Sequence, residues 1–373
     1  MPYALPETPI LAVLDELRLA LAQHRNAVLE APPGAGKSTV VPLALLHEAW
    51  LGSRKIVMLQ PRRIAARAVA RRLAQVVGEE PGRTVGYRTR LDTRVGAATR
   101  IEVVTEGILT RMLQDDPALE TVGCVIFDEF HERNLQSDLG LALALDAQRH
   151  LREDLRLLVM SATLGELPLL PLLGDAALVR SSGRAFEVVT HHVAPAPAGV
   201  NRWPEPIEQR AARLAVRALD SDAGDVLVFL PGTGEIRRAC DSIGAAVADA
   251  DVAVLPLYGD LDAAAQDAAL RPAPSGRRKI VVATNIAETS LTIEGVRVVI
   301  DGGLERRQRF DPNSGMGRLE TVAISRASAD QRRGRAGRTA PGICYRLWSE
   351  SAHVALPAHS PPEMLEADLA PLV

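Results

Sequence analysis

The chain has 373 residues, of which 47% are apolar and 24% charged, a balance typical of a globular protein rather than a disordered or fibrous one. Its length predicts two domains of about 150 residues each, no segment approaches the roughly 20 apolar residues of a membrane span, and the absence of a secretory signal favours a cytoplasmic protein. The net charge of −3 excludes a generally basic surface for nucleic acid, and three well-separated cysteines suggest neither a zinc site nor a disulfide framework.

The first half of the chain begins with an apolar-periodic helix expected over residues 10–22. Short apolar runs then alternate with glycine-rich or polar loops and helical stretches, which predicts a parallel sheet covered by helices. The expected strands are almost continuously apolar, as fully buried parallel strands are. They are Ala27–Leu29, Lys55–Leu59, Ile101–Val104, Cys124–Phe127 and Leu157–Met160.

A candidate phosphate loop, Ala31–Thr39, follows the first of these strands and precedes a helical run. It matches the pattern G-x-x-x-x-G-K-[ST] except that Ala31 replaces the first glycine. Backbone N–H groups at the helix start would bind phosphate, Lys37 would reach the β- and γ-phosphates, and Ser38 would bind Mg²⁺. The alternative is a glycine turn that happens to hold a lysine, but the flanking strand and helix favour the phosphate loop. The expected ATP-binding residues here are Gly34, Ala35, Gly36, Lys37, Ser38 and Thr39.

Two carboxylates, Asp128 and Glu129, come directly after the strand Cys124–Phe127. Ligands of open parallel sheets bind at the carboxyl ends of strands. A metal-phosphate site needs a carboxylate for Mg²⁺ and a base to orient water. We therefore expect Mg²⁺ at Ser38, Asp128 and Glu129, with Asp128 as the main carboxylate ligand and Glu129 as the catalytic base; a solvated charge cluster is the alternative.

The second half of the chain follows a boundary that we place near Ser181. Residues 194–206 break both the helix and the strand periodicity and are expected to form a connection or loop. A second α/β series comes next, and residues 310–315 predict a hairpin turn. Its expected strands are Val226–Leu230, Ala253–Pro256, Ile280–Ala283, Val296–Ile300, Thr321–Ser325 and Ile343–Leu347.

An arginine-rich segment, Gln331–Arg338, lies near the end of this series. If the segment is helical, Gln331, Arg335 and Arg338 share one face. Two converging guanidinium groups suit the charge of a transferring γ-phosphoryl group, although a basic patch for nucleic acid is an equal alternative. A phosphate loop in one domain and arginines in the other predict an ATP-driven motor.

The ordered motifs resemble those of the DEAH-like superfamily 2 helicases, most closely the bacterial HrpB-type ATP-dependent helicases. The likeness extends over nearly the whole chain, and chance would not order all of these segments. They are Ala31–Thr39 (motif I), Gln60–Arg63 (Ia), Val104–Gly107 (Ib), Asp128–His131 (II), Ser161–Thr163 (III), Ala283–Ser290 (V) and Gln331–Arg338 (VI).

The resemblance implies two tandem RecA-like P-loop NTPase domains with parallel central sheets, over residues 1–181 and 182–349. Residues 350–373 would begin a winged-helix region that the chain does not complete. The implied activity is ATP-dependent translocation, 3′ to 5′, along a single strand of RNA, with ATP and Mg²⁺ as cofactors and no implied protein partner. The residues themselves do not distinguish RNA from DNA.

The resemblance also implies roles for individual residues. His131 and Gln331 would meet across the ATP cleft as part of the catalytic set with Glu129, Arg335 and Arg338, and Arg72 would stack on the nucleotide base. Ser161 and Thr163 would link hydrolysis to domain motion. The implied nucleic-acid contacts are Arg62, Arg63, Thr105, Gly107, Thr284 and Asn285.

Two departures from the family pattern matter. Phe130 stands where the family name has alanine, an HrpB-like trait that leaves the acids intact, and Leu270 stands where the family has an aromatic residue opposite Arg72. Two other classes of function stay open: an ATP-gated nucleic-acid clamp that remodels partners without unwinding, and, disfavoured by motifs V and VI, a P-loop metabolite kinase.

Overall fold

The computed structural model describes residues 3–164, 168–183, 186–194, 205–247, 251–289 and 291–370. The chain divides into two compact units, Met1–Arg184 with Pro362–Met364, and Ala185–Pro361 with Leu365–Val373. Most of the predicted connection, residues 195–204, and Ser290 of motif V lie outside the described residues.

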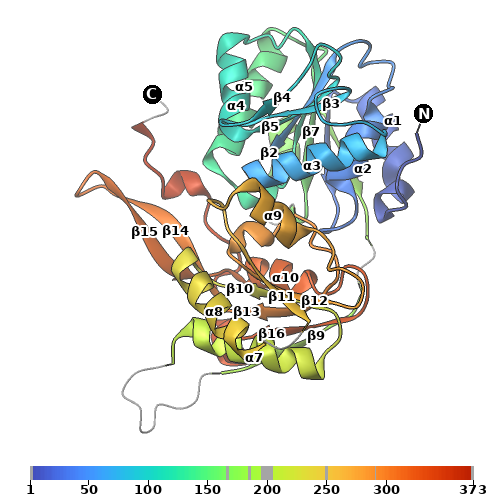
Figure 1. Ribbon diagram of the computed structural model, residues 1–373. Helices are drawn as coiled ribbons and strands as arrows, with labels where there is room; N and C mark the ends of the chain where they lie inside the picture. Colours follow the sequence, from blue (N-terminus) through green and yellow to red (C-terminus); the bar gives the residue numbers. More distant parts are fainter. Residues whose placement is uncertain are drawn as a thin grey trace. The chain divides into compact units, whose positions relative to one another are not determined.

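The first unit is built on a parallel sheet with helices on both faces (Figure 1). In the described part of the chain the strand order is β4-β3-β5-β2-β6-β7-β1-β8, and only the β3–β4 pair is antiparallel. The strands are β1 (Asn26–Glu30), β2 (Lys55–Gln60), β3 (Val85–Arg88), β4 (Thr93–Arg94), β5 (Ile101–Thr105), β6 (Val122–Phe127), β7 (Arg156–Ser161) and β8 (Ala176–Arg180).

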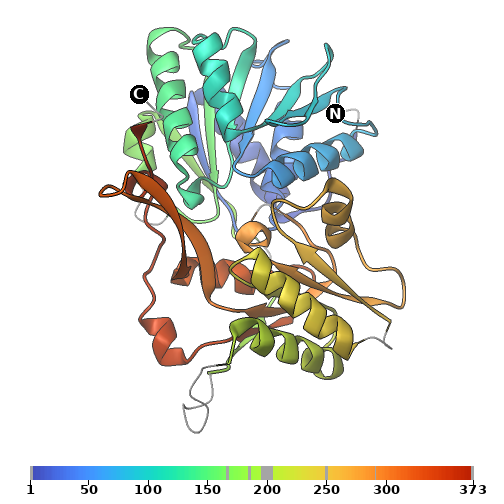
Figure 2. The ribbon, with the colours of Figure 1, turned by 60° about the vertical axis from the view of Figure 1, so that its left-hand side comes forward.

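Helices cover the two faces of this sheet because alternate residues of each strand point to opposite sides. The buried residues of β1 show this alternation: Ala27 and Leu29 pack in one apolar cluster and Val28 in the other. Figure 2 shows α4 and α5 (teal and green) side by side on one face. The helices are η1 (Pro9–Val13), α1 (Leu14–Gln23), α2 (Lys37–Leu45), α3 (Arg63–Val76), α4 (Glu106–Asp115), η2 (Phe130–Glu132), α5 (Leu135–His150) and α6 (Leu169–Leu173).

The second unit holds a parallel sheet in the order β11-β12-β10-β13-β16-β9, within the described residues, and a separate antiparallel hairpin, β14–β15. Its main apolar cluster lies under α7 and α8. The strands are β9 (Val188–His192), β10 (Asp225–Phe229), β11 (Val252–Leu257), β12 (Arg278–Ala283), β13 (Val296–Asp301), β14 (Leu304–Asp311), β15 (Met316–Ala323) and β16 (Gly342–Arg346). The helices are α7 (Ile207–Ser221), α8 (Thr233–Ala246), α9 (Ala263–Leu270), η3 (Asn285–Ala287), α10 (Arg326–Gly334) and α11 (Glu350–Val354). The short helix η4 (Glu363–Leu365) has its first two residues in the first unit and its last in the second.

Most predicted strands are confirmed, and one is partly wrong. Residues 321–325 were expected as a strand of the second α/β series, but β15 ends at Ala323 and pairs only with β14, as one arm of the hairpin. Ser325 instead caps α10, where its side chain accepts the N–H of Ser328. The predicted hairpin turn is confirmed: Gly315, at φ 64°, donates its N–H to the carbonyl of Asp311.

Candidate functional site

The phosphate loop forms a tight turn between β1 and α2. Gly36 is the N-cap of α2 at φ 97°, in the left-handed region that favours glycine, and a Cβ there would lie 2.6 Å from the Thr8 hydroxyl oxygen. Lys37 is only 5% exposed, and its ammonium donates to the carbonyls of Ala31 and Pro32. A helix start beside a buried cation is the arrangement at which anions such as phosphates commonly bind.

Asp128 accepts hydrogen bonds from both sides of the site. Its Oδ2 atom accepts from the Ser38 hydroxyl at 2.5 Å and from the side-chain amide of Gln60. Burial, and then the neighbouring Glu129 carboxylate, raise the pKa of Asp128, whereas the charge of Lys37 lowers it. A hydroxyl and a carboxylate in contact beside a phosphate loop fit a magnesium ion, which prefers oxygen ligands and keeps bonds to substrate phosphates.

Glu129 is the N-cap residue of the one-turn helix η2 and has a left-handed conformation, at φ 51°. Its Oε2 atom lies 3.6 Å from Nε2 of His131, and Nδ1 of His131 accepts the N–H of Ala162 at 3.2 Å. That acceptor role places the proton of a neutral imidazole on Nε2, toward Glu129. The loop Ser161–Thr163 also contacts the phosphate loop, because the N–H of Ala31 donates to the Ser161 carbonyl.

The predicted nucleic-acid contacts of the first unit lie at two neighbouring strand ends. Arg62 caps α3 after β2, and Thr105 caps α4 after β5, which pairs with β2. Arg63 and Gly107 are exposed, and Arg62 is ion-paired with Glu132 at 3.1 Å. Arg72, the predicted partner of the nucleotide base, is exposed on α3.

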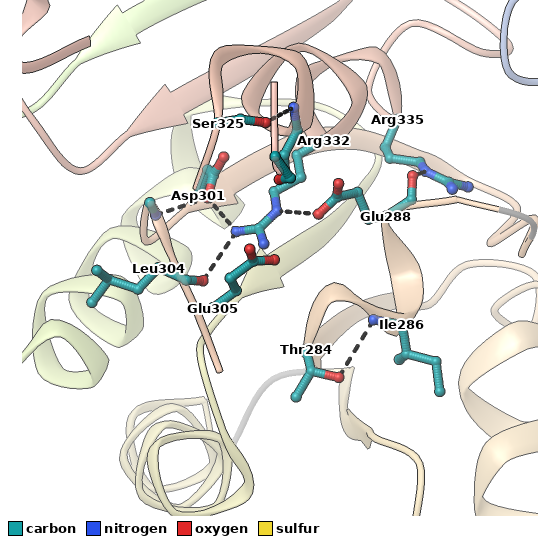
Figure 3. Close-up of polar contacts among 12 residues, drawn as sticks. Thr284, Ile286, Glu288, Asp301, Leu304, Glu305, Ser325, Arg332 and Arg335 are labelled. Atoms are coloured by element: carbon teal, nitrogen blue, oxygen red, sulfur yellow. Dashed lines mark hydrogen bonds and ion pairs between the residues drawn. The ribbon is translucent and has the colours of Figure 1, made fainter. Parts of the chain in front are cut away.

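In the second unit, motifs V and VI contact each other (Figure 3). Thr284 caps η3 after β12, and its hydroxyl accepts the N–H of Ile286 at 3.4 Å, with Asn285 next in the chain. The Arg335 guanidinium donates to the carbonyls of Glu288 and Leu291. Arg338 donates to the Leu291 carbonyl and to the Thr292 hydroxyl, each at 3.2 Å.

The expected continuous helical face of motif VI is only partly present. Helix α10 contains Gln331 but ends at Gly334, Arg335 is its C-cap, and Arg338 follows in a turn. Glycine has low helix propensity, so an end at Gly334 is physically reasonable. Arg335 and Arg338 still converge, because both bind the Leu291 carbonyl.

Two residues of these sites were not predicted. Gln60 is buried at the end of β2 and contacts Asp128 because β2 pairs with β6, an adjacency that the sequence does not state. Arg332 is fully buried and binds Glu288 at 2.8 Å and Asp301 at 2.9 Å (Figure 3). Burial by itself would lower the pKa of Arg332, but Asp301 and Glu288 more than offset this and raise it.

Each half of the chain matches a helicase family model. A family model described as DEAD/DEAH box helicase matches residues 14–168, and one described as helicase conserved C-terminal domain matches residues 210–340. The ATP-dependent RNA helicase HrpB of Escherichia coli (strain K12) is 50% identical over 365 residues, which is 98% of this chain and 44% of that protein. The probable ATP-dependent RNA helicase DHX34 of Mus musculus is 36% identical over 98% of this chain and 32% of its own length.

Solved structures agree. A crystal structure of the E. coli DEAH/RHA helicase HrpB has a TM-score of 0.91 and 49% identity, covering 98% of this chain and 46% of that one. A crystal structure of the E. coli DExH-box NTPase HrpB has a TM-score of 0.84 and 48% identity, covering 99% and 45%. The chain thus spans less than half the length of these relatives. With both helicase models matched in order, it belongs to the DEAD/DEAH box helicase family and carries that family's two RecA-like domains.

Proposed function

We propose that this chain is the motor of an ATP-dependent RNA helicase that hydrolyses Mg-ATP at the cleft between its two RecA-like domains. The observation that carries the proposal is the group Lys37, Ser38 and Asp128, in which a buried cation, a helix start and a carboxylate–hydroxyl pair lie together. Phosphoryl transfer depends mainly on such positioning and charge neutralisation.

Each residue of the first unit has a task in this proposal. Lys37 and the N–H groups at the start of α2 would bind the β- and γ-phosphates, and Ser38 and Asp128 would hold Mg²⁺, which would supply charge neutralisation at the phosphate oxygens. Glu129, which also borders the metal site, orients the attacking water and accepts its proton, and the Nε2 side of His131 faces Glu129 from 3.6 Å.

The second unit supplies the remaining charge. Arg335 and Arg338 would stabilise the transferring γ-phosphoryl group, and Gln331 would take part beside them. Their positions depend on Glu288 and Leu291 of motif V and its following loop. Because Thr284 and Asn285 lie in the same motif, nucleic-acid binding and charge stabilisation would use one connected segment.

Nucleic acid would bind the two units through backbone contacts. Arg62, Arg63, Thr105 and Gly107 of the first unit, with Thr284 and Asn285 of the second, provide the guanidinium, hydroxyl, amide and backbone groups that contact phosphates and sugars without reading sequence. Ser161 and Thr163 would transmit hydrolysis to motion, supported by the hydrogen bond between the Ser161 hydroxyl and the Thr163 carbonyl.

Steady-state ATP hydrolysis tests the proposal. Turnover is measured at fixed salt with no strand, with single-stranded RNA and with single-stranded DNA of the same sequence. Strong stimulation by RNA alone supports the RNA motor, equal stimulation supports a motor without strand preference, and none contradicts a strand-activated motor. Release of a labelled strand from duplexes with a 3′ or a 5′ overhang tests the 3′ to 5′ direction; turnover without release would favour an ATP-gated clamp.

A further inference from the structure

We infer that Glu132 is a positioning residue that links nucleic-acid binding at Arg62 to the acid pair Asp128–Glu129. The inference rests on the proposed function, because it concerns how a bound strand would change ATP turnover. In the inferred arrangement, a phosphate of the bound nucleic acid replaces Glu132 as the partner of Arg62. Glu132 then moves and shifts the turn that carries Glu129.

Glu132 is hydrogen-bonded through its backbone to Glu129, the proposed catalytic base. It ends the one-turn helix η2, and its N–H donates to the Glu129 carbonyl at 3.0 Å. The residues on either side of η2, Glu129 and Arg133, have φ values of 51° and 52°. Residues other than glycine seldom adopt this region, so the surrounding contacts must hold the turn in place. A contact that moves Glu132 therefore acts directly on the backbone of Glu129.

Glu132 forms an ion pair with Arg62. The Nη2 atom of Arg62 lies 3.1 Å from Oε2 of Glu132, and the two side chains are only 22% and 11% exposed. The pair is thus better shielded from water than an ordinary surface pair. A guanidinium binds phosphate and carboxylate through the same donors, so a strand phosphate at Arg62 competes with Glu132.

The surroundings of the pair make this competition effective. Burial raises the pKa of Glu106 to about 8, a hydrogen bond from Ser137 opposes the rise, Glu132 and Glu363 add to it, and Arg62 lowers it. Glu363 is held nearby, since its carboxylate accepts the N–H of Leu135 at 2.9 Å. Arg62 is therefore a cation that offsets neighbouring carboxylates, and its engagement by a phosphate of the nucleic acid weakens this offset at Glu132.

The test compares Glu132→Gln, Arg62→Gln and the double variant with the unchanged chain. Affinity for a labelled single-stranded RNA is measured by fluorescence anisotropy without nucleotide, and ATP turnover is measured with and without saturating RNA. Glu132→Gln should bind RNA severalfold more tightly, because an amide competes less well for Arg62, and the ratio of stimulated to unstimulated turnover should fall at least fivefold. In the Arg62→Gln background, Glu132→Gln should change neither quantity.

Asp138→Asn is the matched control. Asp138 pairs with Arg133 at 2.9 Å, one residue beyond Glu132, and has no contact with Arg62 among the bonds that the described residues show. Its RNA affinity and stimulation ratio should match the unchanged chain. Glu132→Asp, which keeps the charge but shortens the side chain, should restore RNA affinity to the unchanged value and leave the stimulation ratio low.

Three results decide between the possibilities. Unchanged or weaker RNA binding by Glu132→Gln overturns the inference, since a purely structural residue would give that result. The same loss of stimulation in the Arg62→Gln background also overturns it, because Glu132 would then act independently of Arg62. If the unchanged chain shows no ATP turnover, the proposed function fails, while the affinity comparison still tests the link between Glu132 and Arg62.

Discussion

At the scale of single residues, the proposed function gives Lys37 and Glu129 separable tasks. Lys37 would supply charge to the bound phosphates, whereas Glu129 would act on the attacking water. Glu129→Gln should therefore bind ATP almost as the unchanged chain does but turn it over at least about a hundredfold more slowly, the usual contribution of a positioned base. Equilibrium binding of a fluorescent ATP analogue and steady-state phosphate release would measure the two effects.

Lys37→Ala provides the contrast to this prediction. Removal of the ammonium should abolish nucleotide binding itself, so that the two variants fail at different steps. Equal turnover in Glu129→Gln and the unchanged chain would show that another group orients the water, and would remove the assignment of Glu129 as base.

Glu106 should make the stability of the chain depend on pH. Its pKa is raised by burial from 4.5 to about 8, so the folded chain keeps a proton that the unfolded chain loses above about pH 4.5. The free energy of unfolding should therefore fall as pH rises between about 4.5 and about 8, by up to about 1.4 kcal/mol per pH unit. Urea unfolding at pH 6 and pH 8 would measure the fall.

Glu106→Gln isolates this contribution. The amide keeps the shape of the protonated acid and can still accept the hydrogen bond from the Ser137 hydroxyl, which is 2.9 Å long in the unchanged chain. Its free energy of unfolding should fall less between pH 6 and pH 8 than that of the unchanged chain. Equal falls in the two proteins would show that other groups cause the pH dependence.

At the scale of elements, Arg332 joins α10 to the end of β13 and to motif V. Its guanidinium is enclosed by Asp301, Glu288 and the ring of Phe229, whose centroid lies 4.9 Å away. Arg332→Met would leave two buried carboxylates without their cation, which costs about 3–5 kcal/mol of the free energy of unfolding. Chemical denaturation, followed by circular dichroism, would measure the loss.

The neighbouring arginine is the control for this prediction. Arg333 has a side chain 44% exposed and lies 3.8 Å from Asp330, so Arg333→Met should change the free energy of unfolding by less than about 1 kcal/mol. Similar losses in both variants would mean that the burial of Arg332 does not determine its contribution.

The elements that could be predicted from the sequence are those whose residues are buried on both sides. β1, β2, β5, β6 and β7 are mostly apolar and mostly buried, because helices cover both faces of their sheet. The strands β3, β4, β8 and β9 were not predicted. β8 and β9 lie at sheet edges, and most of their residues are half-buried or exposed. The arms of the hairpin are mostly half-buried or exposed, and only its turn and residues 321–323 of β15 were predicted.

The site could be predicted where the functional side chains directly follow an apolar strand in the same segment of the chain. The phosphate loop and the acid pair meet that condition, since each follows an apolar strand directly. Gln60 and Arg332 do not meet it. Gln60 lies 68 residues along the chain from its partner Asp128, and Arg332 lies 31 residues from Asp301 and 44 from Glu288. Such contacts depend on which strands become neighbours, and the local pattern of residues does not specify strand order.

At the scale of the whole molecule, charge must act locally. The net charge is −3, and among 43 basic residues only Lys37, Lys55 and Lys279 are lysines. Lys37 belongs to the phosphate loop and Lys279 is buried, so neither is placed to contact the backbone of a nucleic acid. Binding to nucleic acid should therefore depend on a few arginines at defined positions rather than on the general field of the protein.

The salt dependence of strand binding tests this view. For single strands, the logarithm of the binding constant falls by about 0.7 per phosphate contact for each tenfold rise in salt. Arg63, an exposed arginine of motif Ia, should account for one such contact, so Arg63→Gln should reduce the slope by about 0.7. Anisotropy titrations of a labelled oligonucleotide at several salt concentrations would measure the slope, with Arg149→Gln, on the distant end of α5, as a control of equal charge change. A slope lowered equally by both substitutions would show that the chain attracts nucleic acid through its total charge, because only a local contact makes the position of the arginine matter.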